Sequence, residues 1–212
     1  MNLAIQKLPD LIISDVSMPV MDGITFCEKI KTSIDTSHIP VILLTSLTDS
    51  EIKYKGLDKG ADDYISKPFE IDYLLIKVRN LIAGRENLRK FFQNSIILEP
   101  SKITVTSSDE IFLRNLMQKI EKGIPDPEYS IKDIESDMAM SHSKFYNKVK
   151  ALTGLSGKEF LQEMRLKRAA QLIVSNPQLS VADISDMSGF SDSKYFSTCF
   201  KAKFNVPPTA YK

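Results

Sequence analysis

Residues 11–23 read LIISDVSMPVMDG, and this stretch decides the fold of the first half of the chain. A short apolar run, Leu11–Ser14, ends at Asp15, and a proline and a glycine follow before a helical pattern begins. Two similar short runs occur later, at Val41–Leu44 and at Asp63–Ser66. Because apolar strands that alternate with helices are typical of βαβ units, the pattern predicts a parallel sheet.

The remaining organisation is predicted from helical spacing. Helices are predicted in the first half at Ile24–Ser33, Ser50–Lys59 and Ile71–Ile82. Gly84 then breaks the pattern, and residues 85–108 are predicted to be a linker. Beyond it apolar residues keep helical spacing and no strand is predicted. We therefore expect an α/β domain over residues 1–84 and an all-α domain over residues 109–212.

Composition excludes several classes of protein. The 212 residues are 42% hydrophobic and 26% charged, which is ordinary for a globular protein. No apolar run approaches the roughly 20 residues that a membrane helix needs. Cys27 and Cys199 are far apart, and His38 and His142 do not cluster with them, so neither a disulfide framework nor a zinc site is predicted. We expect a cytoplasmic protein.

Reactive side chains follow each of the three predicted strands. Asp15 follows the first strand, Thr45 and Ser46 the second, and Lys67 the third. The carboxyl ends of parallel strands meet at one edge of a sheet, where ligand and catalytic groups lie. A carboxylate nucleophile, a hydroxyl donor and an ammonium suit phosphoryl chemistry. No second carboxylate is placed as a general acid or base near Asp15, so an enzyme is not predicted.

These motifs resemble the later part of a response-regulator receiver domain, over residues Pro9–Arg85. The resemblance rests on Asp15 with the following MPxMDG sequence, on Thr45, and on Lys67 with the following Pro-Phe. It implies that Asp15 is the phosphoacceptor and that Lys67 contacts the phosphoryl group. It also implies that Thr45 and Tyr64 form a switch pair, and that the main-chain carbonyl of Ser17 binds Mg²⁺.

The N-terminus departs from that family. Only 14 residues precede Asp15, and Asp10 is the only acid among them. The expected fold is thus a partial flavodoxin-like parallel sheet without its early strands, in which Leu11–Ser14 forms an exposed edge. Mg²⁺ is expected as a ligand of a complete receiver. In this chain Asp15 and the Ser17 carbonyl remain as its ligands, whereas the pair of acidic residues that normally precedes the phosphoacceptor strand is absent. We expect the chain to be a fragment of a longer protein or a truncated reading of its gene.

The second half contains an internal repeat. Residues 130–144 align with residues 180–194, and a slip of one residue extends the match. Each copy has a Ser-x-x-Asp helix start, a short helix, a tight turn and a second, basic helix. This is the plan of a helix-turn-helix unit, so two units are predicted near residues 130–154 and 180–205. A pair of helical hairpins used only for packing is the alternative.

Charge separates the two halves. Residues 1–100 carry 12 basic and 14 acidic residues, whereas residues 101–212 carry 16 and 13. Basic residues concentrate around the second helix of each predicted unit, which indicates an anionic partner such as nucleic acid. Residues 109–212 resemble the AraC-type DNA-binding domain, most strongly in the stretch GFSDSKYF at 189–196. A helix near Glu159–Val174 is expected to join the units.

The resemblance and the helical spacing together give candidate DNA contacts. Phe145, Val149 and Leu152 share one helix face, as do Phe196, Phe200 and Phe204, and both faces are assigned to the core. The residues predicted to face outward toward DNA are His142, Lys144, Asn147, Lys148, Asp192, Lys194, Ser197, Thr198 and Lys201. Lysines there are expected to hold phosphates, while His142, Asn147 and Thr198 are candidates for reading base edges.

Two functions stay open. The first is a transcription regulator of a two-component phosphorelay, which binds two major-groove half-sites of double-stranded DNA and is controlled by phosphorylation of Asp15. A histidine kinase would be its phosphoryl donor, in cis as in hybrid regulators or in trans, and a homodimer is a further expected partner. The second is a constitutive DNA-binding module whose receiver remnant serves packing or dimerisation.

Overall fold

The structure is a computed structural model that describes residues 1–46, 59–95, 104 and 106–211. It divides into two compact units. The first comprises Met1–Phe91 with Pro100–Phe112, and the second comprises Phe92–Glu99 with Leu113–Lys212. No helix within the described residues combines the length and the apolar composition that crossing a membrane requires.

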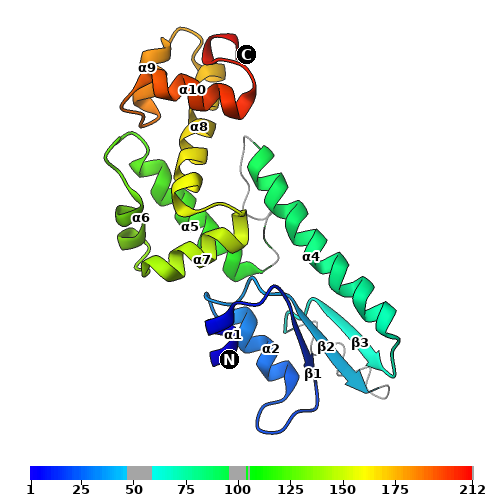
Figure 1. Cartoon of the computed structure of the whole chain (residues 1–212). Coiled ribbons are helices and arrows are strands. Elements are labelled where there is room, and N and C mark those ends of the chain that lie inside the picture. The colour runs from blue at the N-terminus through cyan, green and yellow to red at the C-terminus, as the bar shows by residue number, and fades with distance from the viewer. Residues whose placement is uncertain (47–58, 96–103, 105, 212) are drawn as a thin grey trace. The chain divides into compact units, whose positions relative to one another are not determined.

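The first unit is built on a parallel sheet (Figure 1). Its elements in chain order are α1 (Asn2–Lys7), β1 (Ile12–Asp15), α2 (Gly23–Thr32), β2 (Val41–Ser46), β3 (Asp63–Lys67) and α4 (Ile71–Asn94). The described strands lie in the order β1-β2-β3, with Ile13 opposite Ile42 and Leu44 opposite Ile65. The predicted parallel α/β arrangement is confirmed.

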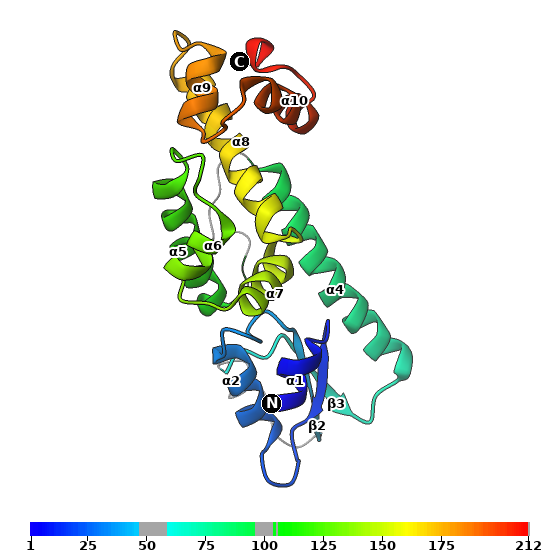
Figure 2. The same cartoon turned by 60° about the vertical axis from the view of Figure 1, so that its left-hand side comes forward.

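One face of this sheet carries the core of the first unit. Val41 and Leu43 of β2 are fully buried there against Cys27 and Ile30 of α2 and against Ala4 of α1. Figure 2 shows both helices on the same side of the strands. Helix α1 was not predicted from the sequence. The predicted helix Ser50–Lys59 lies almost wholly outside the described residues.

Strand β1 lies at the edge of the described sheet, as the sequence predicts. Its only described partner is β2, and the side chain of Ile13 is 44% exposed. An apolar side chain beside an unpaired strand edge is a template for further pairing.

Helix α4 is longer than predicted. It runs for 24 residues, Ile71–Asn94, and passes through Gly84 without interruption, so the predicted break there is wrong. A side chain at Gly84 would meet no atom within 4 Å, which shows that neither a turn nor a close contact uses this glycine. A glycine inside a helix costs only about 1 kcal/mol relative to alanine, and the flanking residues sustain the helix. Residues 85–94 of the predicted linker are therefore helical.

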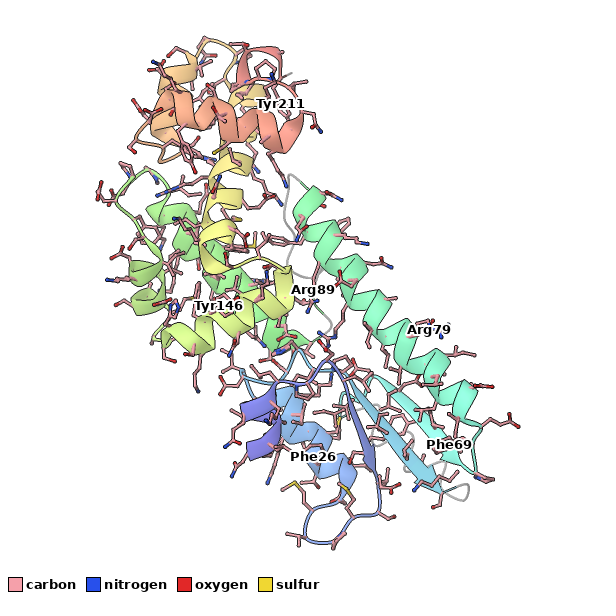
Figure 3. The ribbon with its side chains drawn as sticks, viewed as in Figure 1. Phe26, Phe69, Arg79, Arg89, Tyr146 and Tyr211 are labelled. Carbon is pink, nitrogen blue, oxygen red and sulfur yellow. The ribbon has the colours of Figure 1, made fainter. Side chains whose placement is uncertain are left out.

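The second unit consists of helices and contains no strand among the described residues. They are α5 (Ser107–Gly123, which begins in the first unit), α6 (Ile131–Asp137), α7 (His142–Thr153), α8 (Gly157–Ser175), α9 (Val181–Met187) and α10 (Ser193–Phe204), followed by a 3₁₀ turn at Pro208–Ala210. Phe196 and Phe200 of α10 are fully buried against α8 and α9. The ring of Tyr211, labelled in Figure 3, closes this core 5.2 Å from that of Phe200.

The last turn of α4 is part of the second unit. Phe92 is fully buried, and its ring stacks on that of Phe160 at 5.4 Å between centroids. The ammonium of Lys167 donates to the carbonyl of Phe92 at 2.5 Å, and that of Lys203 donates to the carbonyl of Gln93 at 2.5 Å. Glu163 pairs with both lysines, at 3.2 Å and 2.7 Å. Phe160, Glu163, Lys167 and Lys203 thus hold the last turn of α4 in the second unit.

Candidate phosphorylation site and nucleic-acid interface

The carboxyl edge of the sheet brings together two of the predicted phosphoryl-binding groups. Lys67 at the end of β3 forms an ion pair with Asp15 at the end of β1, across the end of β2. Their side chains are 45% and 44% exposed, so both groups can be reached from solvent. A carboxylate nucleophile beside a cation at an open edge is compatible with phosphoryl transfer.

The loop after β1 explains why Asp22 and Gly23 belong to the motif. A side chain at Gly23 would come within 2.1 Å of the carbonyl oxygen of Asp15, so only glycine lets α2 begin this close to the strand. Asp22 caps the helix, because its carboxylate accepts from the N–H groups of Ile24 at 3.0 Å and Thr25 at 2.9 Å. These bonds, those from Thr25 first, lower the pKa of Asp22. Both residues thus shape the backbone around Asp15.

Thr45 and Tyr64 lie on one face of the sheet. Leu43 is opposite Tyr64 and Thr45 is opposite Ser66, so strand alternation places both predicted switch residues on the same side. Thr45 is 2% exposed, and its hydroxyl donates to the carbonyl of Ser46 at 2.9 Å. The hydroxyl of Tyr64 is buried without a hydrogen-bond partner among the described residues, and burial raises its pKa above the usual range.

The residues around Asp15 do not fit a Mg²⁺ ion by themselves. Within the described ranges, no three His, Cys, Asp or Glu side chains gather in one place. The carboxylate of Asp15 is already paired with Lys67, and Ser17 offers only its carbonyl. Mg²⁺ demands a near-ideal octahedron of oxygen ligands. We therefore assign no step to a metal at these residues.

The second unit contains the predicted repeat, and both copies begin with the same cap. The N–H of Ser130 donates to Asp133 at 2.9 Å, and that of Ser180 donates to Asp183 at 3.0 Å. Each serine hydroxyl also donates to the same carboxylate, and these side-chain bonds lower the pKa of both aspartates. The two helix starts are thus fixed by identical capping boxes.

The two copies also share left-handed backbone positions. Ala139 in the first turn has φ 52° and Gly189 in the second has φ 74°. The second helices of the two copies, α7 and α10, hold the position of the recognition helix in a helix-turn-helix unit, and they end on Gly154 at φ 76° and Asn205 at φ 61°. The repeat is therefore one backbone shape built twice from partly different residues, as two helix-turn-helix units require.

Comparisons with known proteins support both halves. Residues 1–79 match the response regulator receiver domain, and residues 135–212 match a helix-turn-helix domain. This chain joins a response regulator receiver domain to an AraC-type helix-turn-helix domain. Both domain matches, together with relatives named as a DNA-binding transcriptional regulator and as a response regulator, support a two-component DNA-binding regulator.

The chain spans less than half the length of two relatives that it matches. Over all of its 212 residues the chain is 42% identical to Histidine kinase P4 of Formosa agariphila, of which it spans 15%. Over 103 residues, 49% of the chain, it is 38% identical to the DNA-binding dual master transcriptional regulator RpaA of Synechocystis sp., of which it spans 43%. The C-terminal domain of AraT, a response regulator from Geobacillus stearothermophilus, is 26% identical, with 47% of this chain and 81% of that one covered and a TM-score of 0.43.

Most residues predicted to contact DNA are on the surface of the helix-turn-helix domain. The exposed ones are His142, Lys144, Asn147, Asp192, Lys194, Thr198 and Lys201. Ser197 is half-buried, and its hydroxyl donates to the carbonyl of Ser193 at 2.9 Å. Their contacts with DNA stay predictions.

Lys148 does not face outward, and its predicted placement is wrong. It is only 2% exposed and lies among the buried residues of α7. The reason is helical spacing, since Lys148 follows Phe145 by three residues and precedes Leu152 by four, which places it on the apolar face.

Three candidates also have local structural tasks. Asp192 caps α10 by accepting from the N–H of Tyr195 at 2.7 Å. Thr198 donates its hydroxyl to the carbonyl of Lys194 at 3.0 Å. His142 lies 2.7 Å from Glu135 across the turn between α6 and α7. Changing any of these residues therefore perturbs the fold as well as the surface.

Two exposed aromatic residues of the recognition helices were missed. Tyr146 in α7 is 42% exposed and is labelled in Figure 3, and Tyr195 in α10 is 56% exposed. Each is adjacent to a buried phenylalanine, Phe145 and Phe196, so it points away from the apolar face. That adjacency is the sequence signal that identifies both as surface residues.

Proposed function

We propose that the chain is a sequence-specific transcription regulator whose DNA binding is controlled by phosphorylation of Asp15. The observation that supports the receiver's part is the solvent-accessible ion pair of Asp15 with Lys67 at the carboxyl edge of the sheet. A histidine kinase, in cis or in trans, supplies the phosphoryl group, as the receiver family implies. The chain's own relatives include one named as a histidine kinase and one named as a DNA-binding regulator.

The proposed transfer uses groups at the ends of the three strands. A carboxylate oxygen of Asp15 forms a bond to phosphorus, while the donor's leaving group departs with the electrons of the bond that breaks. The ammonium of Lys67 stays beside the new acyl phosphate and offsets its charge. Phosphorylation adds about −1.5 to −2 charges, which biases Thr45 and Tyr64 toward a second arrangement.

Phosphoryl uptake by Asp15→Asn tests this assignment. The chain and its variants are incubated with acetyl phosphate, with and without Mg²⁺ in the buffer, and the hydroxylamine-labile phosphoryl group is measured by mass spectrometry. We expect one group on the wild-type chain and none on Asp15→Asn. Asp10→Asn is the matched control, because it changes an exposed carboxylate that precedes the opposite end of β1. Labile phosphate on Asp15→Asn would overturn the assignment.

The constitutive module is the second candidate function, and it is favoured by the lack of an acidic cluster beside Asp15 among the described residues. Under this alternative the wild-type chain takes up no phosphoryl group from acetyl phosphate or from a histidine kinase. It nevertheless binds DNA with the same affinity before and after treatment. The two candidates therefore differ in two measurements, the uptake of a phosphoryl group and the change of DNA affinity on incubation with a phosphoryl donor.

DNA contact is proposed through α7 and α10, on two major-groove half-sites in direct orientation about 10 base pairs apart. Lys144 and Lys194 occupy matching exposed positions in the two copies. Replacing either by alanine is expected to weaken binding to all sequences and to reduce the salt slope by roughly one. Lys122→Ala, an exposed lysine of α5, is the control with unchanged slope. An unchanged affinity and slope for Lys144→Ala would exclude the first unit from DNA.

A further inference from the structure

A cleft of about 640 Å³ lies within the helix-turn-helix domain, and the proposed DNA contacts leave it unused. Its walls come from the residues before and at the start of α6, from one side of α8, and from the turn that leads into α10. The volume lies within the range of roughly 300–1,000 Å³ that is typical of small-molecule sites. Both helix-turn-helix units thus contribute to one cleft.

The side chains that line the cleft combine apolar surface with positive charge. Its rings are those of Tyr129, Phe190 and Tyr195, the last two 6.4 Å apart between centroids. Its charged residues are three basic ones against a single acid: Lys132, Lys158, Arg165 and Glu128. Such a lining suits a ligand that has an apolar body and an anionic group.

Arg165 gives the cleft its most specific feature. One terminal nitrogen of its guanidinium donates to the carbonyl oxygens of Asp126 and Tyr129, both at 3.1 Å. Its Nε is buried and has no hydrogen-bond partner among the described residues. Burial lowers the pKa of this guanidinium. The nearby charge of Asp126 offsets part of this effect, while the guanidinium hydrogen bonds at 3.1 Å go to main-chain carbonyls.

We propose that this cleft binds a small monocarboxylate with an aromatic body. The carboxylate pairs with Arg165 and Lys158, and the body packs on Phe190 and Tyr195. Because the walls come from both helix-turn-helix units, a bound ligand contacts both of these units at once. Its binding therefore raises the melting temperature of the helix-turn-helix domain.

Calorimetric titration of the full chain tests the proposal without DNA. The probes are 3-phenylpropanoate, its uncharged amide 3-phenylpropanamide, and inorganic phosphate. We expect the carboxylate to bind at least tenfold more tightly than the amide, because only the former carries the anionic group. Phosphate in equimolar competition leaves carboxylate binding unchanged, because it lacks the apolar body. Equal binding of acid and amide, or displacement by phosphate, overturns the proposal.

Two exposed positions provide variants that spare the fold. Ser191→Trp places a ring in the cleft and is expected to abolish binding, and Lys158→Gln is expected to weaken it at least tenfold. Lys122→Gln, outside the cleft, is the matched control with unchanged affinity. Circular dichroism of each variant confirms its helix content. Retained affinity in folded Ser191→Trp locates the ligand elsewhere and refutes the site.

Discussion

Replacing Phe92 by alanine tests whether the last turn of α4 is anchored in the DNA-binding unit. The side chain is fully buried and stacks on Phe160 at 5.4 Å. Truncation of a buried phenylalanine costs about 3–5 kcal/mol. The ammonium of Lys167, 4.6 Å from the ring centroid, adds about 0.5–2 kcal/mol of cation–π attraction. We expect the free energy of unfolding of this unit to fall by about 4 kcal/mol.

Hydrogen exchange of the full chain, followed by mass spectrometry, measures this loss locally. The amides of α8 report the opening of the unit, and a loss of about 4 kcal/mol accelerates their exchange about a thousandfold. Phe91→Ala is the matched control, since the neighbouring ring is 47% exposed and its removal is expected to cost about 0.5 kcal/mol. Equal exchange in the two variants, or acceleration confined to the first unit, would refute the anchoring of α4.

Further predictions concern backbone and pH. Gly84→Ala should stabilise α4 by about 1 kcal/mol, seen as slower exchange of its amides, because the added methyl group meets nothing. Ala139→Gly should raise the melting temperature, since alanine at φ 52° is strained by about 1–2 kcal/mol. Gly189→Ala should lower it, because the new Cβ would lie 2.0 Å from the carbonyl of Ile124. The pKa of Asp183 is lowered by the Ser180 hydroxyl and N–H, so its cap stabilises the fold above the unfolded pKa, near 4, and is lost as the pH falls further. Thermal melts from about pH 6 to pH 2 should therefore show a steeper loss for the wild type than for Asp183→Asn.

Local patterns predicted the elements that local residues determine. The three strands, their parallel order and the capping boxes at Ser130 and Ser180 followed from short-range spacing, and the structure contains all of them. The meeting of Asp15 with Lys67 followed from a general rule about strand ends. These features depend on few residues and on backbone geometry.

The features that the sequence did not reveal depend on partners distant along the chain. The end of α4 is determined by Lys167 and Lys203, which lie 75 and 110 residues further along the chain and donate hydrogen bonds to its last carbonyl oxygens. Gly84 carries no information about these distant lysines, so the sequence predicted the end of the helix there and not at Asn94. The charge of Lys148 indicates an exposed residue, but its position between Phe145 and Leu152 places it on the buried face of α7. The cleft beside Arg165 arises only when both copies of the repeat pack on α8.

The two copies of the repeat keep one backbone and differ on the surface. His142 in the first corresponds to Asp192 in the second, and Asn147 corresponds to Thr198. A dimer of identical subunits reads a palindrome, which is the same in both directions. If both surfaces contact DNA as proposed, two unlike surfaces in one chain recognise an asymmetric site, whose sequence differs between its two directions. Inverting such a site within a promoter then reverses the direction in which the bound chain points along the gene.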